Sequence, residues 1–360
     1  MSTSNEHIQA LQQGAIDLLK NLIATPSFSR EEDGTARILK DYLEQNGCAV
    51  QRLKNNVWSR NAQFDPSKPT ILLNSHHDTV KPNPAYTLDP FTPIETEGKL
   101  FGLGSNDAGG SLVSLMAAFL YFHQQPDLNY NLIYAASAEE EISGKDGIEK
   151  LIPELGPIDC AIVGEPTLTQ LAIAERGLVV IDAVAHGVAG HAARNEGENA
   201  IYKAMMDIEW IYTYRFEKVS DLIGPVKMTV TSIETPNKAH NVVPSECRFI
   251  IDVRINEHYT HEEVLEIIRQ HLQSEISARS CRLRSSIIQP EHPLVQAGIA
   301  LGKTTYGSPT SSDKALMPFP ALKMGPGDSA RSHTADEFIY LDEIRNGITD
   351  YIQLLNRVLR

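Results

Sequence analysis

The sequence contains few cysteines and no long apolar segment. Its four cysteines, Cys48, Cys160, Cys247 and Cys281, lie far apart and form no Cys-x-x-Cys pair. This spacing argues against a disulfide framework or a cysteine zinc site, and it suits free thiols in a reducing compartment. Apolar runs such as residues 112–121 are too short or too interrupted to span a membrane. The N-terminus shows no charged segment followed by an apolar one, so we expect a cytoplasmic protein.

Basic residues are outnumbered by acidic ones. The sequence has 32 lysines and arginines against 46 aspartates and glutamates, which gives a formal net charge of −14. No basic run interrupts this balance, so we expect the chain to bind neither nucleic acid nor an anionic membrane surface. An acidic excess usually serves solubility, but it can also mean that some carboxylates gather around a cation.

The length and composition favour a globular protein with more than one domain. The chain has 360 residues, of which 42% are hydrophobic and 22% are charged. Short apolar runs typical of buried strands, at 71–73, 131–136 and 160–163, alternate with helical patterns. This alternation predicts the α/β class, with a mixed, largely parallel sheet flanked by helices.

The pattern of elements changes near residue 176. From there to residue 285 a strand, a helix, two strands and a helix follow one another, which predicts a compact α+β insert. Helical patterns resume at 293–302 and from residue 342. We therefore predict a discontinuous first domain, residues 1–175 and 286–360, that is interrupted by a second domain, residues 176–285.

The segment ILLNSHHDTV, residues 71–80, places two histidines and an aspartate at the end of a predicted buried strand. Because successive side chains of a strand point to opposite faces, His76 and Asp78 should project together while His77 points away. Such a His-x-Asp pair can supply a metal ligand and the carboxylate that orients it. The same residues could equally be structural, with their hydrogen bonds satisfied at the strand end.

A second cluster is the glycine-rich turn FGLGSNDAGGS, residues 101–111, which carries Asp107 directly before an apolar helix. An aspartate in this position could simply cap the helix. A dinucleotide-binding loop fits less well, because Asp107 stands where the third glycine of that motif is needed and no clear strand precedes the turn.

Three further polar clusters follow along the chain. ASAEEEISG (136–144) has three glutamates after an apolar strand, which could form an exposed helix start or could surround a cation. A carboxylate beside a metal could also act as a general base. AIVGEPT (161–167) places Glu165 after another strand, and GPGDSARSHTADEF (325–338) places His333 in a polar loop. Each cluster has an ordinary explanation alone, but five of them, at the ends of predicted strands or in adjacent loops, are much harder to dismiss together.

The combined pattern resembles a known family, the co-catalytic zinc aminoacylases and carboxypeptidases. The family includes acetylornithine deacetylase, succinyl-diaminopimelate desuccinylase and several dipeptidases. The resemblance covers nearly the whole chain and implies a zinc-exopeptidase-like catalytic domain with an inserted dimerisation domain. It is carried, in order, by His76-x-Asp78, Gly104-x-x-Asp107, Glu140-Glu141, Gly164-Glu165-Pro166-Thr167 and His333.

The resemblance implies two zinc ions per subunit, with cobalt as a possible substitute. One ion would be bound by His76 and Glu165 and the other by Glu141 and His333, while Asp107 would bridge the two.

The resemblance also implies roles beside the metals. Asp78 would orient His76, and Glu140 would be the general base. The family usually has Asp-Glu-Glu where this chain has three glutamates, so a register that assigns base and ligand to Glu139 and Glu140 stays open.

The insert resembles the family's dimerisation domain at AHGVAGHAARNEGENA (185–200). By this resemblance His191 would help to stabilise the oxyanion of the partner subunit's site, and we expect a homodimer. Arg176, Asn241 and Arg254 match family positions near the substrate, and we predict Gly325 as a further substrate contact. His191 and the two arginines could also be ordinary surface residues, and Asn241 an ordinary turn residue.

The segment 308–338 resembles acetylornithine deacetylases more than the peptidase branches. This implies hydrolysis of an N-acyl amino acid, most simply N2-acetyl-ornithine in arginine biosynthesis, with N-succinyl-ornithine or N-acetyl-citrulline left open. A succinyl-diaminopimelate desuccinylase or a dipeptidase is the alternative within the family. A non-catalytic amino-acid-binding relative is a further alternative, although a binding protein has no need of Glu140.

Overall fold

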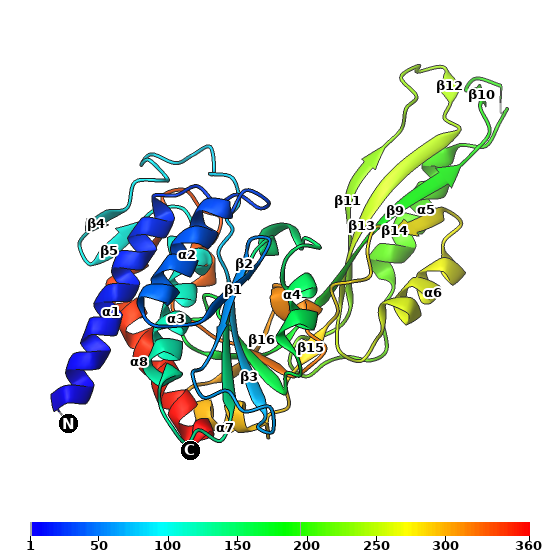
Figure 1. The fold of residues 1–360 in the computed structure, drawn as a ribbon. Coiled ribbons are helices and arrows are strands. Elements are labelled where there is room, and N and C mark those ends of the chain that lie inside the picture. Colours follow the sequence, from blue (N-terminus) through cyan, green and yellow to red (C-terminus); the bar gives the residue numbers. More distant parts are fainter. Residues whose placement is uncertain (1, 195) are drawn as a thin grey trace. The chain divides into compact units, whose positions relative to one another are not determined.

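The computed structural model describes residues 2–194 and 196–360 (Figure 1). The chain divides into two compact units. The first contains the residues up to Ile173 together with Ile288–Tyr306 and Ser312–Arg360, and the second contains Ala174–Ile287 and Gly307–Ser311. The segment Gly307–Ser311, which the sequence-based division assigns to the first domain, therefore clusters with the second unit.

The first unit is built on a mixed β-sheet. Within the described residues, its neighbouring strands are β1 (Val50–Leu53), β2 (Asn56–Arg60), β6 (Asn131–Ser137), β3 (Thr70–His76), β7 (Cys160–Val163), β17 (Ala321–Lys323) and β8 (Leu171–Glu175). The central pairs β6–β3, β3–β7 and β7–β17 are parallel, and the pairs toward the edges are antiparallel. This arrangement confirms the predicted α/β class with a largely parallel sheet.

Helices cover both faces of this sheet. On one face, Leu72 and Ile133 pack against α4 (Ile148–Leu155). On the other face, Tyr134, the residue after Ile133, donates a hydrogen bond to the Leu112 carbonyl in α3 (Gly110–His123) at 3.3 Å. Because both faces are covered, every residue of β3 and of β6 is buried. This explains why these strands read as continuous apolar runs. The remaining helices of this unit are α1 (Ser2–Ile23), α2 (Asp33–Gln45), α7 (Pro293–Ile299) and α8 (Leu341–Leu359).

A small separate sheet lies in the same unit. It consists of β18 (Phe338–Tyr340), β5 (Lys99–Phe101) and β4 (Ile94–Thr96). Since β5 ends at Phe101, a short strand does precede the glycine-rich turn, where the sequence shows no clear one. A strand of three residues, KLF, is too short to produce a recognisable alternation.

The second unit is an α+β structure with its own core. Its antiparallel sheet has the order β11 (Lys227–Glu234), β13 (Glu246–Ile255), β9 (Gly177–His186) and β14 (Glu275–Ala278) among the described residues. Side chains of β9 alternate between buried and partly exposed, so one face is covered. The helices α5 (Ala200–Thr213) and α6 (His261–His271) contribute to the core on that face. Shorter strands include β10 (Gly190–His191), β12 (Val242–Val243), β15 (Ser286–Ile287) and β16 (Thr305–Ser308), the last of which crosses the boundary of the units.

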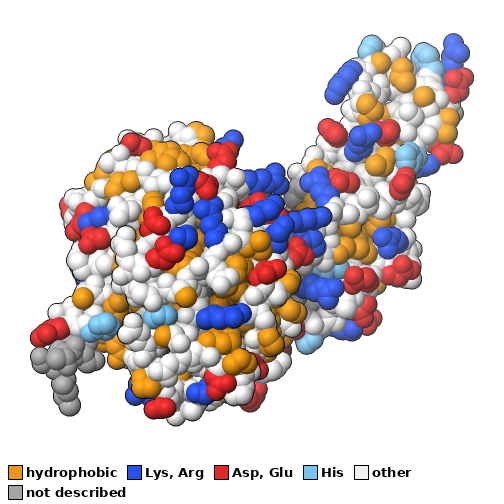
Figure 2. All heavy atoms as spheres, in the orientation of Figure 1, with side chains coloured by type: hydrophobic (Ala, Val, Ile, Leu, Met, Phe, Trp, Pro, Cys, Tyr) orange, Lys and Arg blue, Asp and Glu red, His pale blue; other side chains and the backbone are white. Residues whose placement is uncertain are grey.

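The surface is ordinary for a globular protein. Acidic and basic side chains are interspersed on the face shown in Figure 2. Among residues 2–194 and 196–360, no helix combines the length and the apolar character needed to cross a bilayer.

Candidate metal centre

His76 is the last residue of β3, and its ring is oriented by Asp78. The Nδ1 atom of His76 lies 3.0 Å from the backbone oxygen of Asp78 and 3.5 Å from its Oδ1. Because a carbonyl oxygen can only accept, Nδ1 carries a hydrogen, which leaves Nε2 as the nitrogen available to a metal. This is the tautomer that a metal ligand requires when it binds through Nε2.

Asp78 also holds the acidic segment that follows β6. Its carboxylate accepts hydrogen bonds from the backbone N–H groups of Glu140 at 3.0 Å and Glu141 at 3.2 Å, and from the Ser29 hydroxyl at 2.7 Å. Burial opposes ionisation, but the hydrogen bond and charge of His76 and the hydrogen bond from Ser29 together outweigh it and lower the pKa of Asp78. A single buried carboxylate thus orients His76 and positions the Glu140–Glu141 backbone.

His77 points to a different set of partners, as the alternation of side chains predicts. Its Nε2 lies 2.9 Å from the Asn55 carbonyl oxygen, and its Nδ1 lies 2.9 Å from the Thr35 hydroxyl. Burial lowers the pKa of His77, so the ring stays neutral. His77 therefore joins β3 to α2 and to the loop before β2.

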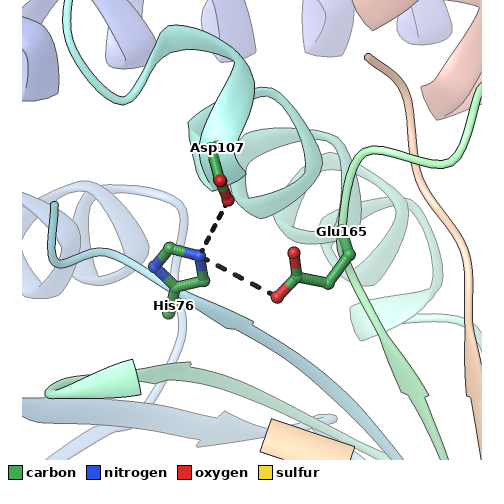
Figure 3. A group of neighbouring side chains, drawn as sticks. All are labelled: His76, Asp107 and Glu165. Atoms are coloured by element: carbon green, nitrogen blue, oxygen red, sulfur yellow. Dashed lines mark hydrogen bonds and ion pairs between the residues drawn. The ribbon is translucent and has the colours of Figure 1, made fainter. Parts of the chain in front are cut away.

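The first cluster of ligand-type atoms consists of His76, Asp107 and Glu165. Figure 3 shows these side chains pointing toward one another, with one atom from each lying within 4.8 Å of the others. The Nε2 atom of His76 lies 3.3 Å from Asp107 Oδ1 and 3.9 Å from Glu165 Oε1. The residues come from the end of β3, from the turn η1 (Ser105–Gly109) and from the loop after β7.

The second cluster consists of Asp107, Glu141 and His333. The Nε2 atom of His333 lies 3.1 Å from Glu141 Oε2 and 3.5 Å from Asp107 Oδ2. The hydrogen bond to Glu141 raises the pKa of His333 to about 9. Asp107 therefore directs Oδ1 toward the first cluster and Oδ2 toward the second, which is the geometry of a bridging carboxylate.

The residues present fit two zinc ions. Their donors are imidazole nitrogens and carboxylate oxygens, which zinc prefers together with thiolates. Two ligands at about 2.0–2.2 Å from one tetrahedral ion lie about 3.3–3.6 Å apart, close to the distances of 3.1–3.9 Å within the clusters. Packing three carboxylates together is costly without a cation between them.

Glu140 and Glu139 have different surroundings. Burial raises the pKa of Glu140 well above its ordinary value, and the carboxylates of Glu165 and Asp313 raise it further, while His76 opposes them. Glu139 instead turns toward its own loop, where its Oε2 accepts from the Asp146 N–H at 3.4 Å. Neither of the two clusters includes Glu139. This arrangement favours the register with Glu141 as ligand.

Asp107 does not cap helix α3, because the residue in the N-cap position is Gly109. The backbone N–H groups of the glycine-rich turn instead donate to the carboxylate of Glu337. An internal carboxylate therefore occupies the position that a phosphate would take in a nucleotide-binding loop. Glu337 was not predicted from the sequence, where its signal is an acidic residue four positions after His333.

A second missed residue, Glu32, is fully buried near the acidic segment. Its carboxylate accepts from the N–H groups of Arg30 at 2.7 Å and Glu139 at 3.1 Å, and from the Asn55 side chain at 2.7 Å. The mostly acidic residues 30–33 predict a helix that starts near Ser29. The helix begins at Asp33 instead, because Glu32 turns inward to hold this loop.

Four predicted site residues belong to the second unit. His191 and Asn241 are exposed, and Arg254 forms a paired hydrogen bond with Asp252 at 2.8 and 3.0 Å. Arg176 donates to the Ile223 carbonyl and lines a cavity of about 570 Å³. Both metal clusters belong to the first unit, so the substrate contacts of these four residues stay predictions.

Gly325, the remaining predicted substrate contact, is buried in the first unit. Its N–H donates to the Thr167 hydroxyl at 3.0 Å, and its carbonyl accepts from the N–H groups of Thr167 and Thr169 at 3.1 and 2.8 Å. A side chain at this position would meet Ser111 and the backbone of Glu165. These contacts show that Gly325 shapes the loop that carries Glu165.

Comparison with known proteins agrees with this fold and site. Residues 72–357 match the family described as Peptidase family M20/M25/M40. The chain therefore belongs to this family of hydrolases, which confirms the resemblance drawn from the motifs.

The relatives within the family include amidohydrolases and peptidases. The chain is 28% identical to a succinyl-diaminopimelate desuccinylase of Stenotrophomonas maltophilia, over 96% of this chain and 99% of the relative. Aminopeptidase PepT of Bacillus cereus has a similar fold, with a TM-score of 0.77, 15% identity and coverage of 97% and 99% of the two chains. So has the Bacillus subtilis YXEP protein, a dinuclear metal-binding peptidase, with a TM-score of 0.73, 16% identity and coverage of 98% and 99%.

Proposed function

We propose that the protein is a metal-dependent amidohydrolase that releases the amino acid from an N-acyl amino acid. The observation that carries this proposal is Asp107, whose two oxygens face two separate ligand clusters near the partly buried Glu140. The dinuclear site named for the YXEP protein and the desuccinylase activity named for the Stenotrophomonas relative support it.

The proposed ligands are His76 and Glu165 for one zinc ion and Glu141 and His333 for the other, with Asp107 shared. Cobalt is a possible substitute. When bound, the two ions would supply Lewis acidity toward the amide carbonyl and toward the attacking water.

The protein's own acid–base group in this proposal is Glu140. Its raised pKa suits a carboxylate that takes a proton from the attacking water and returns it to the leaving nitrogen. The water oxygen forms the new bond to the carbonyl carbon, the C–N bond breaks, and the amine leaves protonated. Asp78 contributes by holding the His76 ring and the Glu140 backbone in place.

For the substrate we propose N2-acetyl-ornithine, in arginine biosynthesis, with N-succinyl-ornithine and N-acetyl-citrulline as close alternatives. The motif resemblance at 308–338 supports this choice. N-succinyl-diaminopimelate is the second candidate, and the desuccinylase names of the relatives favour it.

A substrate panel with and without a chelator tests the proposal. The purified enzyme is incubated with the four N-acyl amino acids and one dipeptide, and the released amine is identified by mass spectrometry. We expect release of ornithine or citrulline, and loss of the activity after chelation. Release of diaminopimelate alone would replace the first substrate with the second, and full activity after complete metal removal would refute the proposed mechanism.

We also propose that the protein forms a homodimer through the second unit. Helix α5 exposes Tyr202, Met205 and Tyr212 by 66%, 57% and 78%, and spacings of three and seven residues place them on one face. Strand β11 is an edge strand of its sheet. A partner subunit would cover this apolar face, and His191 of each subunit would then contribute to the other's site, as the family resemblance implies.

A further inference from the structure

Glu337 is a buried carboxylate with an unusual number of backbone partners. It is 2% exposed and lies directly before β18. Its Oε1 accepts from the N–H groups of Asn106 at 2.8 Å and Asp107 at 2.9 Å, and its Oε2 accepts from the N–H of Gly104 at 3.2 Å. The backbone oxygen of Glu337 accepts a further bond from Gly102 at 3.0 Å.

The turn around Asp107 is shaped to hold an anion. Gly104 has a φ of +75°, and this left-handed conformation helps to turn the amides of residues 104, 106 and 107 toward one point. A Cβ atom at Gly104 would lie 2.6 Å from the Thr79 side chain, so glycine is required for space as well. The anion that fills the turn is the chain's own Glu337.

The turn and the His333 loop are joined by a second pair of contacts. The Asn106 side chain donates to the Asp328 carbonyl at 3.0 Å and accepts from the Asp328 N–H at 3.0 Å. Glu337 and Asp328 therefore hold the turn from the two ends of the loop that carries His333. These hydrogen bonds thus connect the turn that carries Asp107, the ligand shared by both clusters, to the loop that carries His333, a ligand of the second cluster.

We propose that Glu337 is a positioning residue for both metal sites: by holding the Asp107 backbone, it sets the Asp107 carboxylate between the two clusters. This inference rests on the metal site proposed above and not on the choice of substrate. Asp107 Oδ1 faces His76 and its Oδ2 faces His333. A rotation of the Asp107 backbone would therefore displace a ligand from both sites at once.

A purely structural role for Glu337 makes a different prediction. If its hydrogen bonds only stabilise the fold, their loss would lower the stability of the metal-free protein and leave metal affinity intact. If they position Asp107, both metal sites should weaken together, whereas loss of His333 should weaken mainly one.

The test is a titration of the metal-free full-length protein with Co²⁺, followed by visible absorption and calorimetry. The variants are Glu337→Ala, Glu337→Gln and His333→Ala. Asp336→Asn is the matched control. The Asp336 carboxylate also accepts from backbone N–H groups, those of Thr87 and Leu88 at 2.9 Å each, but the segment that contains Thr87 and Leu88 carries no proposed metal ligand.

We expect the wild type and Asp336→Asn to bind two equivalents with the same absorption spectrum. Glu337→Ala should bind both equivalents about 10–100-fold more weakly and with an altered spectrum, the usual range for loss of a group that orients a ligand. The metal affinity of Glu337→Gln should lie between those of the wild type and Glu337→Ala, because an amide oxygen can accept only part of the three N–H bonds.

If Glu337→Ala binds two equivalents of Co²⁺ with the affinity and spectrum of the wild type, the inference is overturned. If Glu337→Ala does not fold, as judged by circular dichroism, the same criterion applies to Glu337→Gln. A wild-type protein that binds no metal would instead refute the proposed function, so the two failures are distinguishable.

Discussion

At the scale of single residues, His76 and His77 differ because their neighbours differ. His76 is oriented by Asp78, and its Nε2 faces the carboxylates of Asp107 and Glu165. His77 bonds the Asn55 carbonyl and the Thr35 hydroxyl, with no carboxylate among these two partners. The first ring is arranged to bind a cation, and the second is arranged to join three segments of the fold.

This difference predicts opposite effects of two alanine substitutions. His77→Ala should lower the free energy of unfolding by about 1–3 kcal/mol, because it leaves buried polar partners unsatisfied, and it should retain the metal content of the wild type. His76→Ala should lose metal. Denaturant unfolding and elemental analysis check both results, and metal loss in His77→Ala would show that the ring takes part in the site.

The triple glutamate gives a second prediction. Glu140→Gln should retain both metals and reduce kcat by about 10²–10⁴-fold, the range for loss of a general base. Glu139→Gln is the matched control, since Glu139 bonds Asp146 in its own loop and belongs to neither cluster. Steady-state kinetics compares the kcat values of the two variants. A larger loss of kcat in Glu139→Gln would assign the base to Glu139 and the ligand to Glu140.

At the scale of elements, helix α8 illustrates how a loop near the site is supported. Gly347 lies inside this helix, and a Cβ atom there would lie 2.8–3.0 Å from three ring atoms of Pro326. Pro326 follows Gly325 in the loop that leads to His333. The missing side chain therefore allows the loop to lie directly on the helix.

Gly347→Ala should consequently be destabilising by about 1–3 kcal/mol through overpacking, although alanine normally favours a helix by about 1 kcal/mol over glycine. The neighbouring exposed residue supplies the control, since Asn346→Ala should be neutral or slightly stabilising. Thermal unfolding of both variants measures the contrast. If Gly347→Ala is instead stabilised, the loop that carries Pro326 can shift to accommodate the added methyl group.

At the scale of the whole molecule, metal binding should contribute to stability. The clusters join β3, η1, the loop after β7 and the His333 loop, which are distant in the chain. Ions that bind only the folded state add about 4 kcal/mol per site at a thousandfold excess over Kd. Calorimetry should therefore show a lower Tm after chelation and recovery with Zn²⁺, and an unchanged Tm would contradict the proposed sites.

The proposed dimer makes a separate prediction for the intact protein. Met205→Glu places a charge in the apolar face of α5, so it should shift the protein from dimer to monomer in sedimentation. It should also reduce kcat if His191 acts across the interface. The control is Glu209→Gln, which changes an exposed residue of the same face without adding a charge and should leave the dimer intact. A fully active monomeric wild type would refute the role of His191 in the partner's site.

The sequence predicted some parts of the fold much better than others. Strands β3, β6 and β7 were predicted because both their faces are buried and they consist of uninterrupted apolar runs. Strands β1 and β2 contain the polar segments VQRL and NVWSR, and α4 is short and includes Pro153, so none of them shows a clear period. Local pattern is informative where apolar residues form a continuous run or follow a clear period over enough residues.

The sequence by itself determined the candidate ligands and their order. It placed three of them at or after strands whose carboxyl ends meet at one edge of the parallel sheet, namely His76, Glu141 and Glu165. It also determined that His76 and His77 point apart, through the two-residue period of a strand. Only the tertiary structure decided which oxygen of Asp107 faces which cluster. It alone showed that Glu337 and Glu32 are buried, because the partners that a buried carboxylate needs come from segments far away in the chain.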